Sequence, residues 1–458
     1  MKSREKEGSR SSLYSRIRKF GWLIRLREKW SDLRYSLWFV PTIIVMGAII
    51  LATVLIQTDG MLGDDLTKQY PRLFGAGAEG SRGMLSAIAS SMITVAGVTF
   101  SITVVALTLA SNQFSPRILR NFMSSRETQV VLGIFVGIYA YCLVVLRTIR
   151  GGDEPFVPSI AVLFGVLLAI VGVYFLIFFI HHIAKSIQVS QIIGDVAEET
   201  KEAIEHLFPK PMGGGEQTET SEPFQATHVT WYRVPSTCEG YIQTVDGDAL
   251  IEFAANRDCV VKMERAIGEF VVLGTPLVSI GPKNGVSEKD EEAVNTLFVI
   301  GRTRTVGQDA IFGIQLIVDV ALKALSPGIN DTATALNCID ALSGVLAKAA
   351  DRNEVSNERV YEGKIRVIAK GPDFASLVEE AFSPIRRSSN YATLIRVLGA
   401  IEAIGYRADS TKRLRELAHQ TQQMIDHGNQ FLESGMDREA VCKRGHEVLV
   451  FLGQRQSA

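Results

Sequence analysis

The sequence predicts an integral membrane protein with four transmembrane α-helices, followed by a cytoplasmic α+β region in which a small β-barrel-like domain precedes a helical domain. Three observations predict this fold class. Four long apolar stretches lie in the first 182 of the 458 residues. The loops that join them alternate between basic and neutral-to-acidic. Beyond residue 183 the apolar pattern is that of strands and then of helices, as in a globular protein.

The four predicted spans are clean apolar segments. Crossing the hydrocarbon core takes about 20 mostly apolar residues in a helix. None of the four stretches has a charged side chain before its last residues, which is unusual for a helix in a soluble core. The predicted spans are residues 38–57, 84–110, 130–148 and 158–180.

The flanking charges predict the orientation of the chain. Residues 1–37 carry eleven Lys and Arg side chains against four acidic ones, whereas the 58–83 loop carries three basic and four acidic residues. The 111–129 loop is basic again, and the 149–157 loop is not. Because Lys and Arg favour cytoplasmic loops, we expect a bacterial inner (plasma) membrane protein whose N- and C-termini are both cytoplasmic.

Residues 1–37 have the pattern of a basic amphipathic arm. Leu13, Ile17, Phe20 and Ile24 recur at helical spacing, with Arg and Lys side chains between them. Such a helix lies in the membrane interface and is attracted to anionic lipid. The expected partner of this arm is therefore a bilayer with an anionic inner leaflet, and the alternative is a solvated basic tail.

The second span differs from the other three because it is rich in small and hydroxyl-bearing residues. At about 100° per residue, six of these residues fall within an arc of roughly 80°. Val104 and Val105 interrupt this arc near its cytoplasmic end. We call these six residues the stripe: Ser86, Ser90, Thr94, Gly97, Ser101 and Thr108.

Two interpretations of the stripe compete. Small residues let membrane helices approach closely, and this packing interpretation is favoured because such interfaces are common. The other interpretation is a water-facing wall that lines a pore in an oligomer, with Val104 and Val105 as an apolar constriction. None of the spans carries a midplane charge, which argues against a secondary transporter with a charged substrate site.

Two sequence runs resemble a known family. They are ITVAGVTFSITVVALTLASNQFSPRILRNF, which begins at Ile93, and ALSPGIND at 324–331. Both resemble a bacterial family of predicted membrane proteins, the domain-of-unknown-function family twenty-two fifty-four, and the resemblance covers nearly the whole chain. It implies four spans and a cytoplasmic C-terminal domain, and it implies no activity.

The region after the spans is expected to fold in three parts. The segment 183–222 reads as a helix and a Pro/Gly-rich linker. Alternating apolar residues predict strands at 241–245, 249–253, 259–263 and 276–280, hence a small β-barrel-like domain over 223–283. The segment 284–458 is predicted to be mostly helical, with one strand at 364–368. The expected helices are 309–325, 332–349, 373–382, 390–404, 409–433 and 437–453.

Polar side chains beside the apolar 309–325 helix form the second candidate site. They either line a ligand pocket or form a hydrogen-bonded network that holds a helix pair, and the network is favoured because buried polar groups need partners. Asp331 or Asn330 is expected to cap the helix that follows. The candidate residues are Arg302, Arg304, Asp309, Asp319, Asn330 and Asp331.

The motifs indicate no enzyme. The sequence has no Walker loop, no dinucleotide fingerprint and no HExxH, and its five cysteines form no CxxC pair. We therefore expect no catalytic residue, no cofactor and no metal. The net charge of −1 gives no reason to expect a nucleic-acid partner.

Two functions stay open for this multi-pass membrane protein. The first is a homo-oligomeric channel or permeation pathway, lined by the stripe of the second span and regulated by the cytoplasmic domain. The second is a membrane-anchored scaffold or sensor, in which the stripe only packs and the cytoplasmic domain binds a partner or ligand.

Overall fold

The structure is a computed structural model, and it describes residues 38–69, 77–113, 126–151, 156–186, 188–207, 230–282, 286–352 and 357–457. The contacts divide the chain into two compact units, with the boundary after Gln191. We call the part before the boundary the membrane unit and the part after it the C-terminal unit. The predicted N-terminal arm, residues 1–37, lies outside the described residues.

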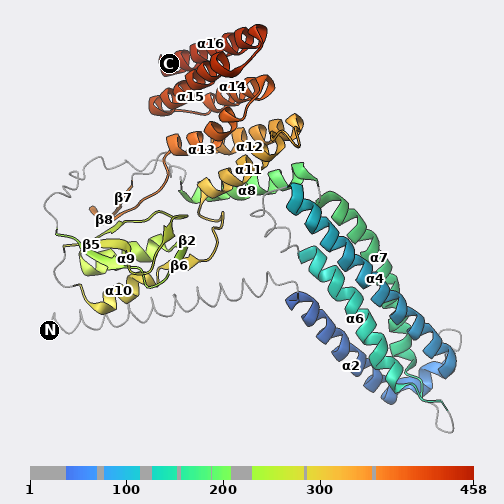
Figure 1. Ribbon diagram of the computed structural model, residues 1–458. Coiled ribbons are helices and arrows are strands. Elements are labelled where there is room, and N and C mark those ends of the chain that lie inside the picture. Colours follow the sequence, from blue (N-terminus) through green and yellow to red (C-terminus); the bar gives the residue numbers. More distant parts are fainter. Residues whose placement is uncertain are drawn as a thin grey trace, which may run out of the picture. The chain divides into compact units, whose positions relative to one another are not determined.

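The membrane unit contains four long apolar helices (Figure 1). Each contains one segment long and apolar enough to cross a membrane, and all four predicted spans coincide with these segments to within a few residues. Helix α6 contacts each of the other three and is the most deeply buried. The helices are α2 (Phe39–Gln69), α4 (Ala78–Gln113), α6 (Arg126–Thr148) and α7 (Ser159–Ser186).

Glycines on α6 and α7 allow the closest helix contacts in the membrane unit. A Cβ atom on Gly133 of α6 would lie 2.7 Å from Cδ1 of Ile44 and 2.9 Å from Cα of Pro41 on α2. On α7, a Cβ atom on Gly172 would lie 3.0 Å from the sulfur of Met92 on α4. Close helix approach in a membrane requires such small residues, and here α6 and α7 provide them.

Two polar side chains of the membrane unit pair with the start of α7. The buried carboxylate of Asp59 on α2 accepts hydrogen bonds from the backbone N–H groups of Ile160 (3.2 Å) and Ala161 (3.0 Å) in the first turn of α7. The hydroxyl of Tyr141 donates to the carbonyl of Ala161 at 2.7 Å. Lipid offers no hydrogen bonds to exposed backbone groups. The Asp59 carboxylate therefore supplies acceptors for N–H groups in the first turn of α7, which have no partner within that helix.

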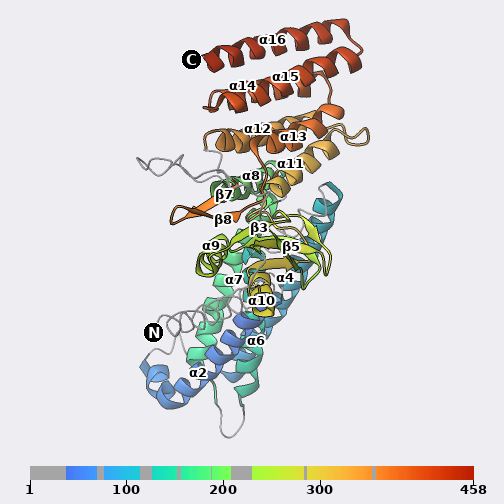
Figure 2. The same ribbon diagram turned by 90° about the vertical axis from the view of Figure 1, so that its left-hand side faces the viewer.

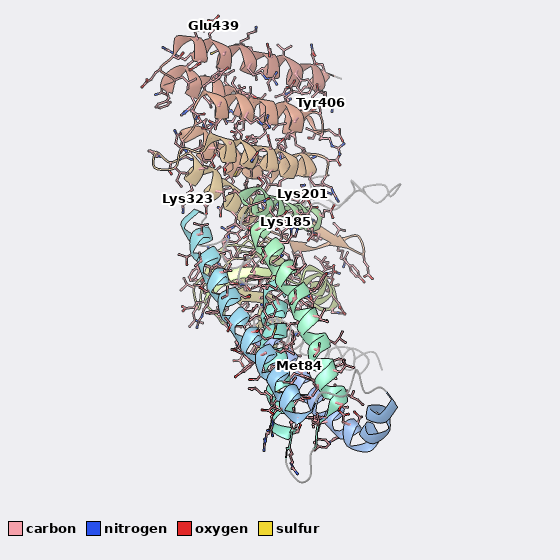
Figure 3. All side chains as sticks on the ribbon, turned by 90° about the vertical axis from the view of Figure 1, so that its right-hand side faces the viewer. Met84, Lys185, Lys201, Lys323, Tyr406 and Glu439 are labelled. Atoms are coloured by element: carbon pink, nitrogen blue, oxygen red, sulfur yellow. The ribbon has the colours of Figure 1, made fainter. Side chains whose placement is uncertain are left out.

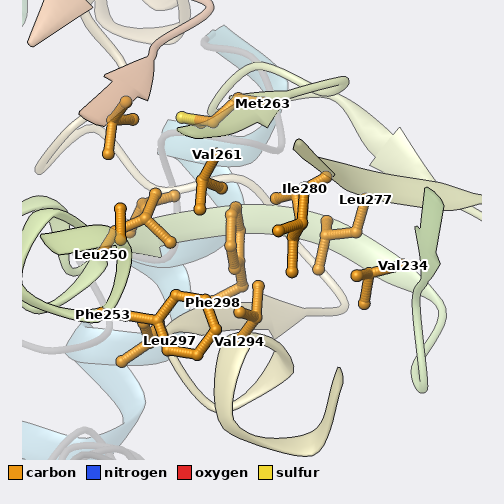
Figure 4. Close-up of a cluster of buried hydrophobic side chains, with 14 of the residues drawn as sticks. Val234, Leu250, Phe253, Val261, Met263, Leu277, Ile280, Val294, Leu297 and Phe298 are labelled. Carbon is orange, nitrogen blue, oxygen red and sulfur yellow. The ribbon is translucent and has the colours of Figure 1, made fainter. Parts of the chain in front are cut away.

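The β-rich part of the C-terminal unit consists of two open sheets. The larger has the order β1-β5-β3-β8-β7, and the smaller has the order β4-β2-β6. The strands are β1 (Tyr232–Pro235), β2 (Gly240–Val245), β3 (Val260–Met263), β4 (Phe270–Val271), β5 (Pro276–Gly281), β6 (Phe298–Gly301), β7 (Glu358–Tyr361) and β8 (Lys364–Ile368). A cluster that includes Phe253, Val261, Leu277 and Phe298 forms their shared hydrophobic core (Figure 4).

The predicted small barrel is not shown, because the described strands form two open sheets. The predicted strand 249–253 belongs instead to helix α9 (Gly247–Arg257). Leu250, Phe253 and Ala254 are buried at helical spacing, and the carboxylate of Asp246 caps the helix by accepting from the Ala249 N–H at 3.0 Å. A short apolar run fits both the strand period and the helical period. The Asp246 cap is the feature of the sequence that favours the helix here.

The helices of the C-terminal unit pack in successive pairs (Figure 2). All six helices predicted beyond residue 309 are present, although β1, β4, β6, β7 and the short α10 (Glu288–Asn295) were not predicted. The predicted strand 364–368 is β8. The helices are α8 (Val189–Leu207), α11 (Ala310–Ala324), α12 (Thr332–Ala350), α13 (Phe374–Arg387), α14 (Tyr391–Gly405), α15 (Thr411–Phe431) and α16 (Gly435–Ser457).

Candidate functional site

Helix α4 packs against its own bundle through one face only. Leu85, Ala89, Met92, Ala96 and Thr99 are buried. Their spacing of three and four residues places them on a single side of the helix. The side of α4 that faces the bundle is therefore largely apolar and contains none of the six stripe residues.

The α4 stripe lies on the opposite side. All six of its residues are exposed on the surface of the single chain. A Cβ atom on Gly97 would meet no atom within 4 Å, whereas the glycines of α6 and α7 that contact their neighbours have no such room. The favoured packing interpretation therefore fails for contacts within one chain. Whether the stripe lines water or packs against another copy stays a prediction.

Large apolar side chains border the stripe on both sides. Ile93 and Phe100 lie along one edge, and Val98 and Ile102 lie along the other, all exposed. Val104 falls in line with the stripe and Val105 beside it, and both are exposed as well, Val105 at 63%. The result is a shallow polar strip between two apolar ridges.

The threonine hydroxyls of the stripe are partly satisfied within the helix itself. Thr94 donates to the carbonyl of Ser90 at 2.8 Å, and Thr108 donates to the carbonyl of Val104 at 2.9 Å. Each hydroxyl oxygen keeps its acceptor capacity, which points away from the bundle. The stripe therefore presents uncharged acceptors and small residues to whatever covers it.

The neighbouring helix α7 has an exposed face of a different kind. Figure 3 shows α4 and α7 side by side, with Met84 on α4 and Lys185 near the end of α7. The exposed positions on α7 carry large apolar side chains, among them Ile170 at 64% and Ile177 at 65% exposure. Helix α2 likewise exposes Ile43 and Ile50. These faces have the composition expected of a lipid contact.

The second predicted site is only partly assembled. Arg304 forms an ion pair with the buried Asp309 at 2.7 Å, and its Nη1 donates to Oε1 of Gln315 at 2.7 Å. Gln315 in turn donates to Glu380 of α13 at 2.8 Å. The Arg304 guanidinium also lies 4.8 Å from the centre of the Phe312 ring. The sequence reasoning did not include Glu380, because only the fold brings α13 to α11.

Asp309 performs two structural tasks at this point. Its Oδ1 accepts from the Phe312 N–H at 3.0 Å and so caps α11, while its Oδ2 faces Arg304. Burial raises the pKa of Asp309, and the Arg304 charge opposes that effect. A cavity of about 30 Å³ beside Asp309 and Lys370 has room for water.

The other predicted residues of this group lie apart from Arg304 and Asp309. Arg302 is exposed. Asn330 and Asp331 lie beyond the opposite end of α11, where Asp331 caps α12 by accepting from the Thr334 N–H at 3.1 Å. Asp319 is half-buried within α11 itself. The network interpretation holds for Arg304 and Asp309, and the predicted cap holds for Asp331.

The last residues of the first run that resembles the family, 114–122, lie outside the described residues, which resume at Arg126. Within the described residues, no group of three or more His, Cys, Asp and Glu side chains is arranged to hold a metal ion.

The fold and the exposed helix faces define a multi-pass membrane protein with an α+β C-terminal unit. The chain belongs to the DUF2254 family of predicted membrane proteins, whose model matches residues 34–403. It is 33% identical over 377 residues to the uncharacterized protein MT1328 of Mycobacterium tuberculosis, with 79% of this chain and 70% of that protein covered. The uncharacterized protein Mb1321c of Mycobacterium bovis is 32% identical over the same length. No solved structure matches the chain.

Proposed function

We propose that the protein is a homo-oligomeric channel or permeation pathway of the bacterial inner membrane, with both termini in the cytoplasm and the C-terminal unit as its regulatory part. One observation carries the proposal: the α4 stripe points away from the bundle of its own chain. Within a single chain, nothing in the described part of the molecule covers that face.

The chemistry of the stripe favours water over lipid as its neighbour. Lipid tails are as apolar as leucine, so a lipid-facing helix gains nothing from hydroxyl groups or an open glycine. Copies of α4 arranged around a common axis would give each stripe an aqueous neighbour, and the apolar ridges on either side would contact the next copy. Because the stripe has no charged residue, it carries no ring of charged side chains that would select cations or anions.

Thiol labelling tests the aqueous wall directly. Cys238 and Cys442 are first replaced by Ser, because neither is buried. Single cysteines at Ser90, Thr94 and Ser101 are then expected to react with a membrane-impermeant thiol reagent. Matched cysteines at the exposed α7 positions Ile170 and Ile177 are expected to stay protected. Protection of the stripe cysteines to the same degree as those on α7 would refute the pathway.

Conductance of the purified protein in planar bilayers tests the constriction. Val104→Ser with Val105→Ser is expected to raise conductance or open time, because an apolar ring gates a pore by excluding water. Val173→Ser is the control, since Val173 is exposed to a similar degree but lies on α7. Equal effects of the two changes would remove Val104 and Val105 from the pathway.

A membrane-anchored scaffold or sensor is the second candidate function. The observation that favours it is an apolar cluster on β4 and the turn after it, where Phe270, Val272 and Leu273 are exposed, Leu273 at 62%. Exposed apolar patches of this kind mark protein contacts. A scaffold would lose a co-purifying partner in the Leu273→Asp variant. It would retain the partner in the Val360→Asp variant, the control, because Val360 is exposed on β7 outside this cluster. The stripe cysteines would stay protected from the thiol reagent.

A further inference from the structure

Helix α8 joins the last membrane helix to the C-terminal unit. It begins at Val189, after α7 ends at Ser186. The boundary between the two compact units falls inside α8, after Gln191. Only residues 187 and 188 separate the two helices along the chain.

One face of α8 is buried within the C-terminal unit, at a helical spacing of three and four residues. Thr200 lies at the middle of this face, where α11 approaches so closely that a Cβ atom on Gly313 would lie 2.1 Å from the Thr200 hydroxyl oxygen. Only glycine allows this approach. The buried residues of the face are Ile193, Val196, Ala197, Thr200, Ala203 and Ile204.

The C-terminal end of α8 is held by charge. Glu205 accepts from Lys348 Nζ at 2.5 Å and from Arg352 Nη2 at 2.6 Å, both at the end of α12. The Arg352 side chain is only 6% exposed, so Glu205 compensates a charge that is largely removed from water. Lys201 also lies against α12, with its Cε 3.8 Å from where a Cβ atom on Gly344 would lie.

The same end of α12 is held from its other side by α15. The buried Arg413 donates to the carbonyl of Ala350 at 2.8 Å and to the carbonyl of Arg352. A continuous set of contacts therefore runs from α15 through the last turn of α12 to Glu205. Movement within the stack of helices reaches α8 by this route.

We propose that α8 is a coupling helix, which moves as part of the α11–α12 layer and carries regulatory displacements of the C-terminal unit to α7. The Glu205 clamp and the Thr200–Gly313 contact fasten it to that layer. The proposal rests on the proposed function for its output, the control of permeation, but the coupling itself is independent of whether the protein conducts.

Hydrogen–deuterium exchange of the full chain in lipid nanodiscs tests the coupling. Glu205→Lys places a positive charge against Lys348 and Arg352, and amides of 192–207 are expected to exchange about tenfold faster. Exchange at 181–186, the last turns of α7, is expected to change with them. Glu202→Lys is the matched control, with the same charge change at an exposed position one turn earlier.

A charge swap keeps the test informative if Glu205→Lys alone unfolds the unit. Glu205→Lys with Lys348→Glu restores one ion pair and is expected to return both segments toward wild-type exchange. If exchange at 181–186 stays at the wild-type rate while 192–207 opens, α8 does not act on α7 and the proposal is overturned. It is equally overturned if Glu205→Lys and Glu202→Lys give the same exchange.

Conductance separates failure of the coupling from failure of the channel. A wild-type protein that never conducts refutes the proposed function, while the exchange result still decides the coupling. A conducting protein in which Glu205→Lys and Glu202→Lys have the same open probability refutes the coupling and leaves the pathway intact.

Discussion

The exposed faces of α4 and α7 lie on neighbouring helices of one bundle and have opposite chemistry. Helix α7 exposes a wall of large apolar side chains, whereas α4 exposes hydroxyl groups and an unfilled glycine between apolar ridges. Both helices satisfy the same length and hydropathy criteria for a membrane span. Mean hydropathy therefore identifies a span, and the distribution of residues around the helix distinguishes what each side of it contacts.

Small residues on the two helices differ in the same way. The glycines that bring helices together are on α6 and α7, while Gly97 on α4 faces open space. A small residue in a membrane helix can allow close packing of two helices or can lie on an open face. Only the neighbouring atoms distinguish these two roles. The three predictions below test this difference, beginning with the largest expected effect.

Replacing the packed and the open glycine should affect stability very differently. Gly133→Ala puts a Cβ atom within 3 Å of both Ile44 and the backbone of Pro41, and we expect it to lower the free energy of unfolding by about 2 kcal/mol. Gly97→Ala should change it by less than about 0.5 kcal/mol. Thermal unfolding in detergent measures both. Equal losses would show that Gly97 is packed in the folded chain.

Truncating a ridge beside the stripe should weaken self-association without affecting the fold. Phe100→Ala removes a large exposed side chain from one apolar ridge of α4, and we expect about a tenfold loss of association, or about 1.4 kcal/mol. Ile170→Ala on α7 serves as the control, because it truncates an exposed apolar side chain on the neighbouring helix. Subunit counting by photobleaching in vesicles at decreasing protein density measures the change. An unchanged association curve for Phe100→Ala would place the subunit contacts elsewhere.

Removing a single stripe hydroxyl should have the smallest effect. Thr94→Val leaves the shape of the side chain, and the hydroxyl proton it removes is already bonded to the Ser90 carbonyl. We expect less than about 0.5 kcal/mol in stability and a reduction in conductance of less than about threefold. Thr53→Val on α2 is the control, since Thr53 is exposed with the same bond to its own helix at 2.8 Å. A larger loss for Thr53→Val would place the pathway along α2.

The sequence predicted the membrane spans well because their signal is local. An uninterrupted apolar run of the right length needs no knowledge of neighbouring segments. The arc that defines the α4 stripe was likewise correct, since it depends only on the helical period. The side on which the stripe would lie could not be predicted, because it depends on which face Leu85 and Met92 present to α6 and α7.

The errors in the C-terminal unit have similar causes. The run 249–253 reads as a strand until the cap at Asp246 is considered, and β6 and β7 are too short to be recognised without the strands beside them. Of the predicted polar group, Arg304 and Asp309 are five residues apart and were correctly associated. Their partner Glu380 lies 65 residues from Gln315, and only tertiary structure brings these two together.

The Asp59 carboxylate has a consequence for how the membrane unit is made. Its two bonds reach 101 and 102 residues along the chain, from the end of the first span to the start of the last. Neither bond can form until α7 has left the ribosome and entered the bilayer. Until then Asp59 lacks these two partners, and insertion of the final helix supplies them.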